Sequence, residues 1–97
     1  MQEIVRLKSG LTLYYYRTGP WLHDKVLHRE DGPAVFGIDH ERWYQFGKIH
    51  REDGPASTNS TGAIKWYLNN TPYSFEEWCN KVQLSKEKLL ELVLKYG

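Results

Sequence analysis

A seven-residue string that occurs twice constrains the fold more than any other feature of this chain. His-Arg-Glu-Asp-Gly-Pro-Ala spans residues 28–34 and again residues 50–56, so equivalent positions are twenty-two residues apart. The similarity extends backwards, because an apolar residue precedes each His and a Trp stands seven residues before it. Periods of this length are typical of stacked supersecondary units, each too small to bury its own apolar face. The sequence therefore predicts an array of short repeats.

The repeat has further, partial copies on either side. A third copy has its Trp-Tyr pair at residues 66–67, against residues 43–44 in the second copy. The first copy can be aligned in two ways. In one alignment Trp21 takes the repeat's Trp position; in the other, residues 9–15 parallel the third copy with two Tyr in the Trp-Tyr places. One of the two requires an insertion around residues 18–20, and both stay open at this point.

Each repeat is expected to form a β-hairpin. Four Trp and seven Tyr, together with eight Gly and four Pro, favour short strands joined by tight turns. In each string, the Asp side chain is expected to bond its own backbone, and the following Gly is expected to adopt a positive φ. Pro33 and Pro55 have no amide hydrogen and belong at a corner or at the first residue of a strand. Strands are expected at residues 34–36 and 63–68.

The C-terminal segment has a helical pattern. Residues 74–77, Ser-Phe-Glu-Glu, match a capping box, and Trp78 and Val82 continue an apolar side with Phe75. A second helix is expected after Ser85, ending at Gly97. Its apolar stripe is predicted to consist of Leu89, Leu90, Val93, Leu94 and Tyr96.

The predicted fold is α+β and mainly β. It is an antiparallel meander of stacked β-hairpin repeats over about residues 9–73, capped by one or two C-terminal α-helices over residues 74–97. At 97 residues the chain is expected to form a single domain, residues 1–97. Successive hairpins should lie side by side, so that the corners formed by the repeated string line up and present their guanidinium groups as a row.

Composition limits the kinds of partner and the cellular compartment that the protein can have. The net charge of +1 argues against broad attraction to nucleic acid or to a membrane surface. The single cysteine, Cys79, excludes a disulfide framework and suits a reducing compartment. No segment has the length and apolarity of a signal peptide or a bilayer span. We expect a cytoplasmic protein without a cofactor.

The repeat also has a family resemblance. A Trp-Tyr pair, a short turn, Lys, an apolar residue and His-Arg-Glu-Asp-Gly-Pro-Ala together resemble the variant MORN-type repeat common in bacteriophage and bacterial proteins. The match covers roughly residues 20–80, and the final Trp-Tyr-Leu-Asn hairpin and Ser-Phe-Glu-Glu-Trp helix resemble phage members. The resemblance implies a binding or scaffolding surface, because fold alone does not decide activity. The chain departs from the pattern at Asp24 and Asn70, which replace the repeat's Gly47, and at residues 71–73, which replace the charged corner.

Two complete repeats supply the candidate site residues. An Arg with a neighbouring Asp can form a fork for phosphate or carboxylate, or an ion pair worth about 0.2 to 1 kcal/mol on a sheet surface. The His can move protons or contact a ligand, or stack on a neighbouring Trp while a backbone carbonyl accepts its hydrogen. The aromatic rings can stack on nucleobases, or one ring of each Trp-Tyr pair can face the core. The candidate ligand- or partner-binding residues are His28, Arg29, Asp31, His50, Arg51, Asp53, Trp21, Trp43, Tyr44, Trp66 and Tyr67.

Catalysis and metal binding have weaker sequence support. Adjacent carboxylates such as Glu30-Asp31 and Glu52-Asp53 on an exposed corner have no obvious pocket to shift their pKa values. The positions of His23, His28, His40, His50 and Cys79 do not match the ligand spacing of a zinc site. We therefore expect neither an enzyme nor a metal centre.

The sequence leaves three functions to compare. The leading prediction is a non-enzymatic binding protein, phage-encoded on the strength of the resemblance, that inhibits or adapts a host cytoplasmic factor such as a defence protein. The first alternative is a sponge that sequesters a nucleotide second messenger through Arg and aromatic side chains. The second is a small hydrolase that uses the repeat His and acidic residues. A homo-oligomer is also expected wherever the helices leave a sheet edge open.

Overall fold

The computed structural model describes residues 2–97 and confirms the predicted fold class, an antiparallel sheet followed by two helices. The main sheet has the order β1-β2-β4-β5-β8-β9-β10, with β3 also paired to β2, and β6 and β7 form a separate hairpin. The sheet begins earlier than predicted, because β1 precedes residue 9. The strands are β1 (Gln2–Arg6), β2 (Thr12–Arg17), β3 (Lys25–Leu27), β4 (Val35–Phe36), β5 (His40–Arg42), β6 (Tyr44–Gln45), β7 (Lys48–Ile49), β8 (Ser57–Asn59), β9 (Ile64–Leu68) and β10 (Thr71–Tyr73).

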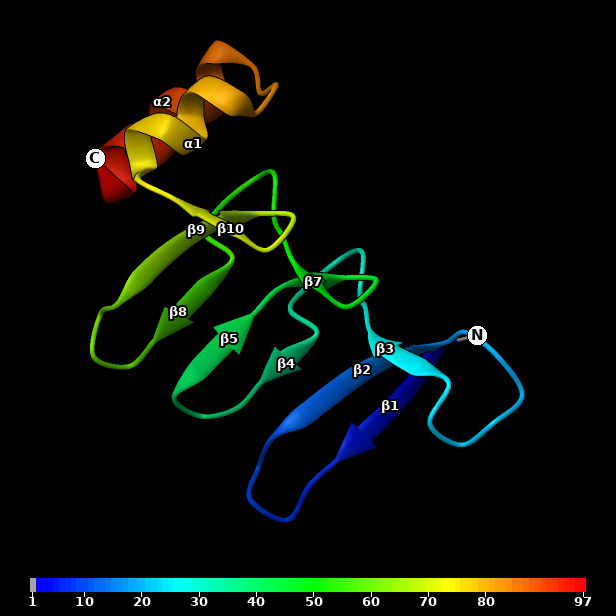
Figure 1. The fold of residues 1–97 in the computed structure, drawn as a ribbon. Helices are drawn as coiled ribbons and strands as arrows, with labels where there is room; N and C mark the ends of the chain where they lie inside the picture. Colours follow the sequence, from blue (N-terminus) through cyan, green and yellow to red (C-terminus); the bar gives the residue numbers. More distant parts are fainter. Residues whose placement is uncertain (1) are drawn as a thin grey trace.

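Equivalent hairpins lie side by side along the molecule. The pairs β1–β2, β4–β5 and β8–β9 follow one another, with their turns at one edge of the array (Figure 1). The loops that lead to β3, β7 and β10 lie at the opposite edge. Two of these loops have positive φ at both central residues, Phe46-Gly47 and Asn69-Asn70, as a type I′ turn requires. The repeat array predicted from the sequence is therefore present.

Backbone hydrogen bonds decide the alignment of the first repeat. The N–H of His28 donates to the carbonyl of Tyr14 (3.0 Å), and the N–H of His50 donates to that of Trp43 (3.0 Å). Tyr14, and not Trp21, thus occupies the place of Trp43. The insertion lies in the β2–β3 loop, which Thr18 closes by donating its N–H to the carbonyl of Asp24 (2.7 Å). Trp21 lies in this loop and is 68% exposed.

The main apolar core lies at the C-terminal end, where helices α1 (Phe75–Lys81) and α2 (Lys86–Tyr96) cap the array (Figure 1). Trp66 from β9, Trp78 from α1 and Leu92 from α2 are buried together. As predicted, the Ser74 hydroxyl caps α1 by accepting from the N–H of Glu77 (3.1 Å), whose carboxylate accepts from the N–H of Ser74 (2.9 Å). These hydrogen bonds lower the pKa of Glu77.

The apolar stripe predicted for α2 is wrong in part. Leu92 is the buried residue of this helix, and Tyr96, one turn later, meets the Trp66 ring edge-on at 5.3 Å between ring centroids. Three of the predicted stripe residues point away from the core: Leu90, Val93 and Leu94. The helix has apolar residues around most of its circumference, so periodicity does not select the side that packs.

The molecule as a whole is elongated. Its principal extents are 43 × 27 × 20 Å and its radius of gyration is 14.5 Å, whereas a compact chain of this length has about 12.5 Å. No helix within residues 2–97 has the length and apolarity needed to cross a membrane. A layer this thin leaves little apolar burial, so contacts between neighbouring hairpins must stabilise the array.

Candidate functional site

The two copies of the repeated string form equivalent loops, which we call corner 1 (residues 28–34) and corner 2 (residues 50–56). Both project to the same side of the array, corner 1 between β3 and β4 and corner 2 between β7 and β8 (Figure 1). Each corner bonds to the hairpin that follows it, because the N–H of Arg29 donates to the carbonyl of Tyr44 and the N–H of Arg51 to that of Tyr67. The corners therefore join consecutive repeats.

The arginine of each corner is held inside its own loop. In corner 2, Nε of Arg51 donates to Asp53 Oδ1 (2.8 Å), and Nη1 donates to the carbonyl of Pro55 (3.1 Å). The guanidinium carbon lies 3.8 Å from the centroid of the Trp43 ring. Only 23% of the Arg51 side chain is exposed. The arginine is thus a clamp between the loop and Trp43, which lies between β5 and β6.

Corner 1 repeats the clamp with a different ring. Arg29 donates to Asp31 Oδ1 (3.1 Å) and to the carbonyl of Pro33 (3.2 Å), and its guanidinium carbon lies 4.1 Å from the centroid of the Tyr14 ring. The predicted row of outward guanidinium groups is therefore wrong. Each guanidinium group stacks on an aromatic ring and donates two hydrogen bonds to its own loop.

The glycines of the corners have a role that the sequence did not indicate. Neither Gly32 nor Gly54 has a positive φ. A Cβ atom on either one would lie 2.7 Å from the guanidinium carbon of its corner's arginine. The Asp side chains accept hydrogen bonds from arginine, whereas the sequence analysis predicted that they would bond to their own backbone. Glycine is needed here for the close approach of the clamp.

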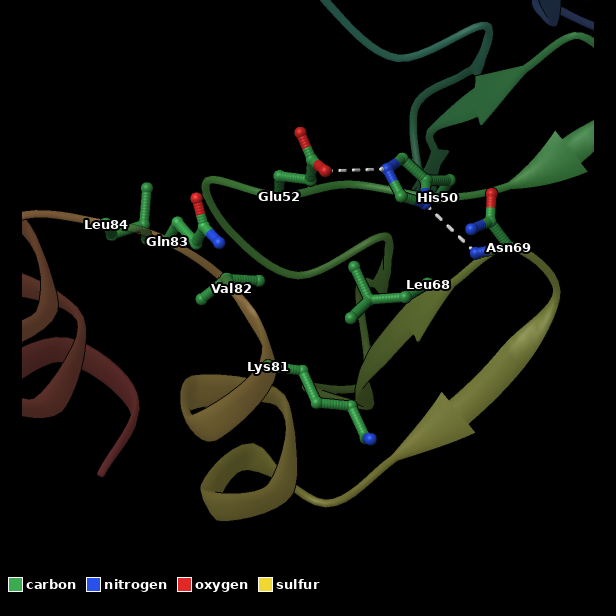
Figure 2. A pocket seen from close by; sticks show the side chains of 8 residues that line it. All are labelled: His50, Glu52, Leu68, Asn69, Lys81, Val82, Gln83 and Leu84. Atoms are coloured by element: carbon green, nitrogen blue, oxygen red, sulfur yellow. Dashed lines mark hydrogen bonds and ion pairs between the residues drawn. The ribbon is translucent and has the colours of Figure 1, made fainter.

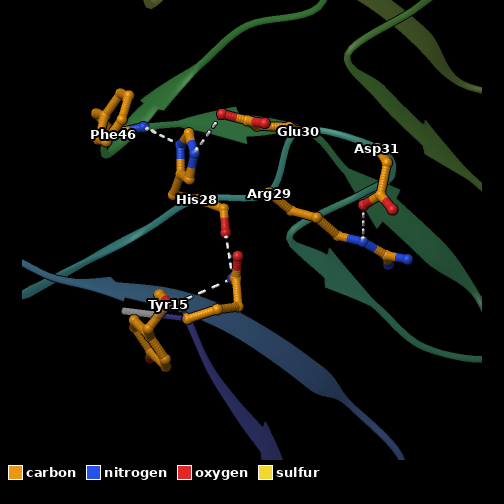
Figure 3. Close-up of polar contacts among 7 residues, drawn as sticks. Tyr15, His28, Arg29, Glu30, Asp31 and Phe46 are labelled. Atoms are coloured by element: carbon orange, nitrogen blue, oxygen red, sulfur yellow. Dashed lines mark hydrogen bonds and ion pairs between the residues drawn. The ribbon is translucent and has the colours of Figure 1, made fainter.

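The corner histidines stabilise the turns of the next hairpin. His28 Nδ1 accepts from the backbone N–H of Phe46 (3.0 Å), and His50 Nδ1 accepts from that of Asn69 (3.0 Å). Figure 3 shows the hydrogen bond between Phe46 and His28. The His28 ring stacks on the Phe46 ring, with centroids 3.9 Å apart. In the structural role predicted from the sequence, each histidine would donate to a backbone carbonyl and stack on a Trp ring. The contacts found are an N–H donor and, for His28, a Phe ring.

The other imidazole nitrogen of each histidine faces a corner glutamate. Because Nδ1 accepts, the neutral ring carries its proton on Nε2. Nε2 of His28 lies 3.8 Å from Glu30 Oε1, and Nε2 of His50 lies 3.5 Å from Glu52 Oε1. Both rings are more than nine-tenths buried, whereas the glutamate side chains are 84% and 71% exposed. The carboxylates are thus the groups that these corners present to solvent.

Two open clefts lie beside the corners. One cleft of about 320 Å³ is lined by residues of both corners, including Glu30, Glu52 and Asp53, with Trp43 at its wall. A second, of about 400 Å³, lies beside corner 1 and is lined by His28, Glu30 and Asp31, among others. We define the corner face as the carboxylates Glu30, Asp31, Glu52 and Asp53 with these two clefts.

A third cleft, of about 580 Å³, lies between corner 2 and the cap. Figure 2 shows His50 and Glu52 on one side of it and Lys81, Val82, Gln83 and Leu84 on the other. Its charge is mixed, because Lys81 and Glu52 both line it. This cleft therefore lacks the excess of carboxylates found in the cleft between the corners, where Glu30, Glu52 and Asp53 accompany Arg51.

The predicted aromatic residues do not form one exposed row. Trp66 is buried in the cap, whereas Trp43, Tyr44 and Tyr67 are half-buried. Trp21 is the exposed ring of the set, but it lies in the inserted loop. The structure brings His28, Arg29 and Asp31 together, and likewise His50, Arg51 and Asp53. Of the predicted aromatic residues, Trp43 contacts a corner directly, through the Arg51 guanidinium group.

Several residues that matter at the corners were not on the predicted list. Tyr14 carries the clamp of corner 1, and the alignment of residues 9–15 with the third repeat was the signal for it. Glu30 and Glu52 were identical in both copies, which was the signal for them. Phe46 had no clear signal, because a bulky residue at a φ of 46° is unusual in a turn.

Few groups in the structure suggest covalent or metal chemistry. Burial raises the pKa of the Cys79 thiol, which disfavours the reactive thiolate. Within the part of the chain that the structure describes, no three His, Cys, Asp or Glu side chains are grouped to hold a metal ion. Comparison with protein-family models, curated proteins and solved structures found no match for this chain. The MORN-type resemblance therefore stays a prediction, and the site is interpreted from its geometry alone.

Proposed function

We propose that this chain is a non-enzymatic binding protein that engages a protein partner through the corner face. The observation that best supports the proposal is the arrangement of side chains within each corner. Arginine, glycine and histidine make internal contacts, whereas the carboxylates point outwards. Binding needs a fixed arrangement of outward groups, and internal clamps supply it. The Arg51 Nε–H bond, for example, holds the Asp53 carboxylate in one orientation.

The partner that fits the corner face is a basic protein surface. Four carboxylates stand against two guanidinium groups in the two corners, and the guanidinium groups are largely covered. Clefts beside the carboxylates give long Lys or Arg side chains space to enter. Complementary charge of this kind contributes to specificity and association rate more than to affinity.

The biological setting follows from the resemblance. Phage members of the MORN-like class suggest an inhibitor or adaptor that acts on a host cytoplasmic factor, including a defence protein. An elongated single layer suits such a role, since it exposes a large surface for a short chain. Occluding a partner requires no catalytic group, in keeping with a site built of ion pairs and hydrogen bonds.

The nucleotide sponge has less support from the geometry. Phosphates would have to pull Arg29 and Arg51 away from their Asp and carbonyl partners and approach four carboxylates. The rings that would clamp bases already carry the guanidinium groups. The hydrolase loses support for a related reason, because Nδ1 of each histidine is committed to a backbone N–H.

A capture experiment with matched charge variants tests the proposal. The immobilised protein, the variant Glu30→Gln/Glu52→Gln and the control variant Glu76→Gln/Glu87→Gln are each exposed to the same bacterial lysate. All four glutamates are exposed, so both double variants remove the same surface charge. We expect one stoichiometric basic protein on the wild type and the control, and its loss from the corner variant. Equal retention by all three proteins would remove the corner face as the binding site.

A nucleotide panel separates the sponge from the proposal. Thermal unfolding is measured with cyclic mononucleotides, cyclic dinucleotides and cyclic oligonucleotides. A ligand at a hundredfold its dissociation constant would add about 2.7 kcal/mol to the free energy of unfolding. We expect no shift in Tm. A shift that disappears in Arg51→Ala would establish the sponge instead.

A further inference from the structure

The two end strands of the sheet differ in how their outer edges are protected. At the cap end, β10 carries Pro72, and α1 packs against β10 and β9. Pro72 pairs with Tyr67, and the carbonyl of Tyr67 accepts from the N–H of Arg51 on the side away from β10. The pair therefore exchanges no hydrogen bonds, and the nitrogen of Pro72 faces outwards. Proline has no N–H to donate to an added strand. This edge is closed to further strands, as natural sheet edges commonly are.

The edge at the other end is open. Among residues 2–97, no strand pairs with the outer side of β1, which lies at the end of the array away from the helices (Figure 1). The strand has no proline or glycine to interrupt an added strand. Five consecutive residues therefore present one regular edge.

The register shows which backbone groups lie on this edge. Ile4 pairs with Tyr14, which donates its N–H to Ala34 (2.7 Å) and accepts from His28 (3.0 Å), both away from β1. In an antiparallel ladder such a pair exchanges no hydrogen bonds, so the N–H and C=O of Ile4 face outwards. By the same alternation, those of Gln2 and Arg6 face outwards too.

We propose that β1 pairs with β1 of a second copy, antiparallel and centred on Ile4, to give one continuous sheet. This register pairs Ile4 with Ile4 and Gln2 with Arg6, so the outward groups of all three residues bond across the two-fold axis. Glu3 then lies opposite Val5. No like charges face each other, so the strand complements itself.

The exposed apolar side chains at this end add to the interface. Ile4 and Leu7 are each 45% exposed, and Tyr16 is 37% exposed. A single pair of five-residue strands buries little area, which places the dimer among weak interfaces and requires high concentration to populate it. The inference rests on the outer edge of β1 and not on the corner carboxylates, although Gln2 and Tyr16 also line the cleft beside corner 1.

Sedimentation equilibrium over about 5 to 500 μM tests the dimer. The average mass should rise from 11.5 kDa towards twice that value. Ile4→Lys sets two ammonium groups opposite each other and should raise the dissociation constant by about tenfold or more. Ile64→Lys is the matched control, because Ile64 is 40% exposed but lies on β9, inside the sheet. It should dimerise like the wild type.

A second variant keeps the test decisive if Ile4→Lys fails to fold. Ile4→Pro removes the outward N–H without removing a hydrogen bond to β2, and circular dichroism checks its fold. A wild type that stays monomeric throughout the range would overturn the proposal. So would folded Ile4→Lys and Ile4→Pro variants that dimerise like the wild type, because the interface would then lie elsewhere.

Discussion

The guanidinium carbon of Arg51 lies over the Trp43 ring, 3.8 Å from its centroid, and the same group bonds to Asp53 and Pro55 of its own loop. One side chain thus connects corner 2 to the residue between β5 and β6. The same arrangement at Arg29 and Tyr14 shows that the clamp tolerates either ring. What the repeat keeps is the contact between arginine and an aromatic face.

Removing the clamp should cost more than a surface ion pair. Arg51→Ala deletes two charge-assisted hydrogen bonds and a cation–π contact, and we expect it to lower the free energy of unfolding by about 2 kcal/mol. Arg29→Ala should cost a similar amount. Urea unfolding measures both. The control is Arg42→Ala at an exposed position of β5, with an expected effect within about 0.5 kcal/mol. Equal costs for Arg51 and Arg42 would mean that corner 2 is solvated.

The histidine of corner 2 should be replaceable by a residue with an acceptor in the right place. The side-chain oxygen of Asn lies where His has Nδ1, so His50→Asn can still accept from Asn69. Gln extends its amide to the position of Nε2. We expect His50→Ala and His50→Gln to lose about 1 to 3 kcal/mol and His50→Asn to lose less, because only Asn satisfies the N–H. Better rescue by Gln would indicate that Nε2 is the important atom.

The tryptophans should differ in their contribution to stability. Trp66 is 5% exposed in the cap, and its replacement by Ala should cost about 3 to 5 kcal/mol. Trp43 is half-buried, so Trp43→Ala should cost less. Its main loss is the face on which Arg51 stacks. Thermal unfolding of the two variants gives the comparison. A larger loss for Trp43 would place the principal core in the repeats and not in the cap.

The thiol of Cys79 should react slowly in the folded protein. Burial raises its pKa, so at any given pH a smaller fraction is thiolate than in the unfolded chain. The pH midpoint of labelling by a disulfide reagent should therefore lie above that of a free cysteine, about 8.5. Urea should bring the midpoint down. Equal midpoints in native buffer and in urea would contradict the burial of this residue.

The sequence predicted the repeat array, the helix caps and the positions of β4 and β9, because these depend on local patterns. Ser74 and Glu77 lie three residues apart, and the Trp-Tyr pairs recur at a fixed period. The direction of each side chain did not follow in the same way. Arg51 stacks on Trp43 because a hairpin turns back on itself, and α2 turns Leu92 inwards because α1 and β9 present Trp78 and Trp66 there. Such choices depend on contacts between elements.

The repeated string itself was the harder part to interpret. Its composition suggested outward guanidinium groups, since charged residues at a turn are usually solvated. The absence of a side chain at Gly54 allows the opposite arrangement, because the guanidinium group fills the space. The predicted corner residues stay together but differ from the prediction in their roles: arginine holds the loop together, and the acidic side chains face outwards.

A double-mutant cycle between Arg51 and Gly54 tests most directly whether the repeated corner is an internal clamp. Gly54→Ala places a methyl group against the guanidinium carbon, so alone it should destabilise the protein by about 1 to 2 kcal/mol. In the Arg51→Ala background the obstruction is gone, and the same change should be neutral or stabilising by about 0.4 to 1 kcal/mol. The account predicts this strong coupling in the free energies of unfolding. Strictly additive costs would contradict it.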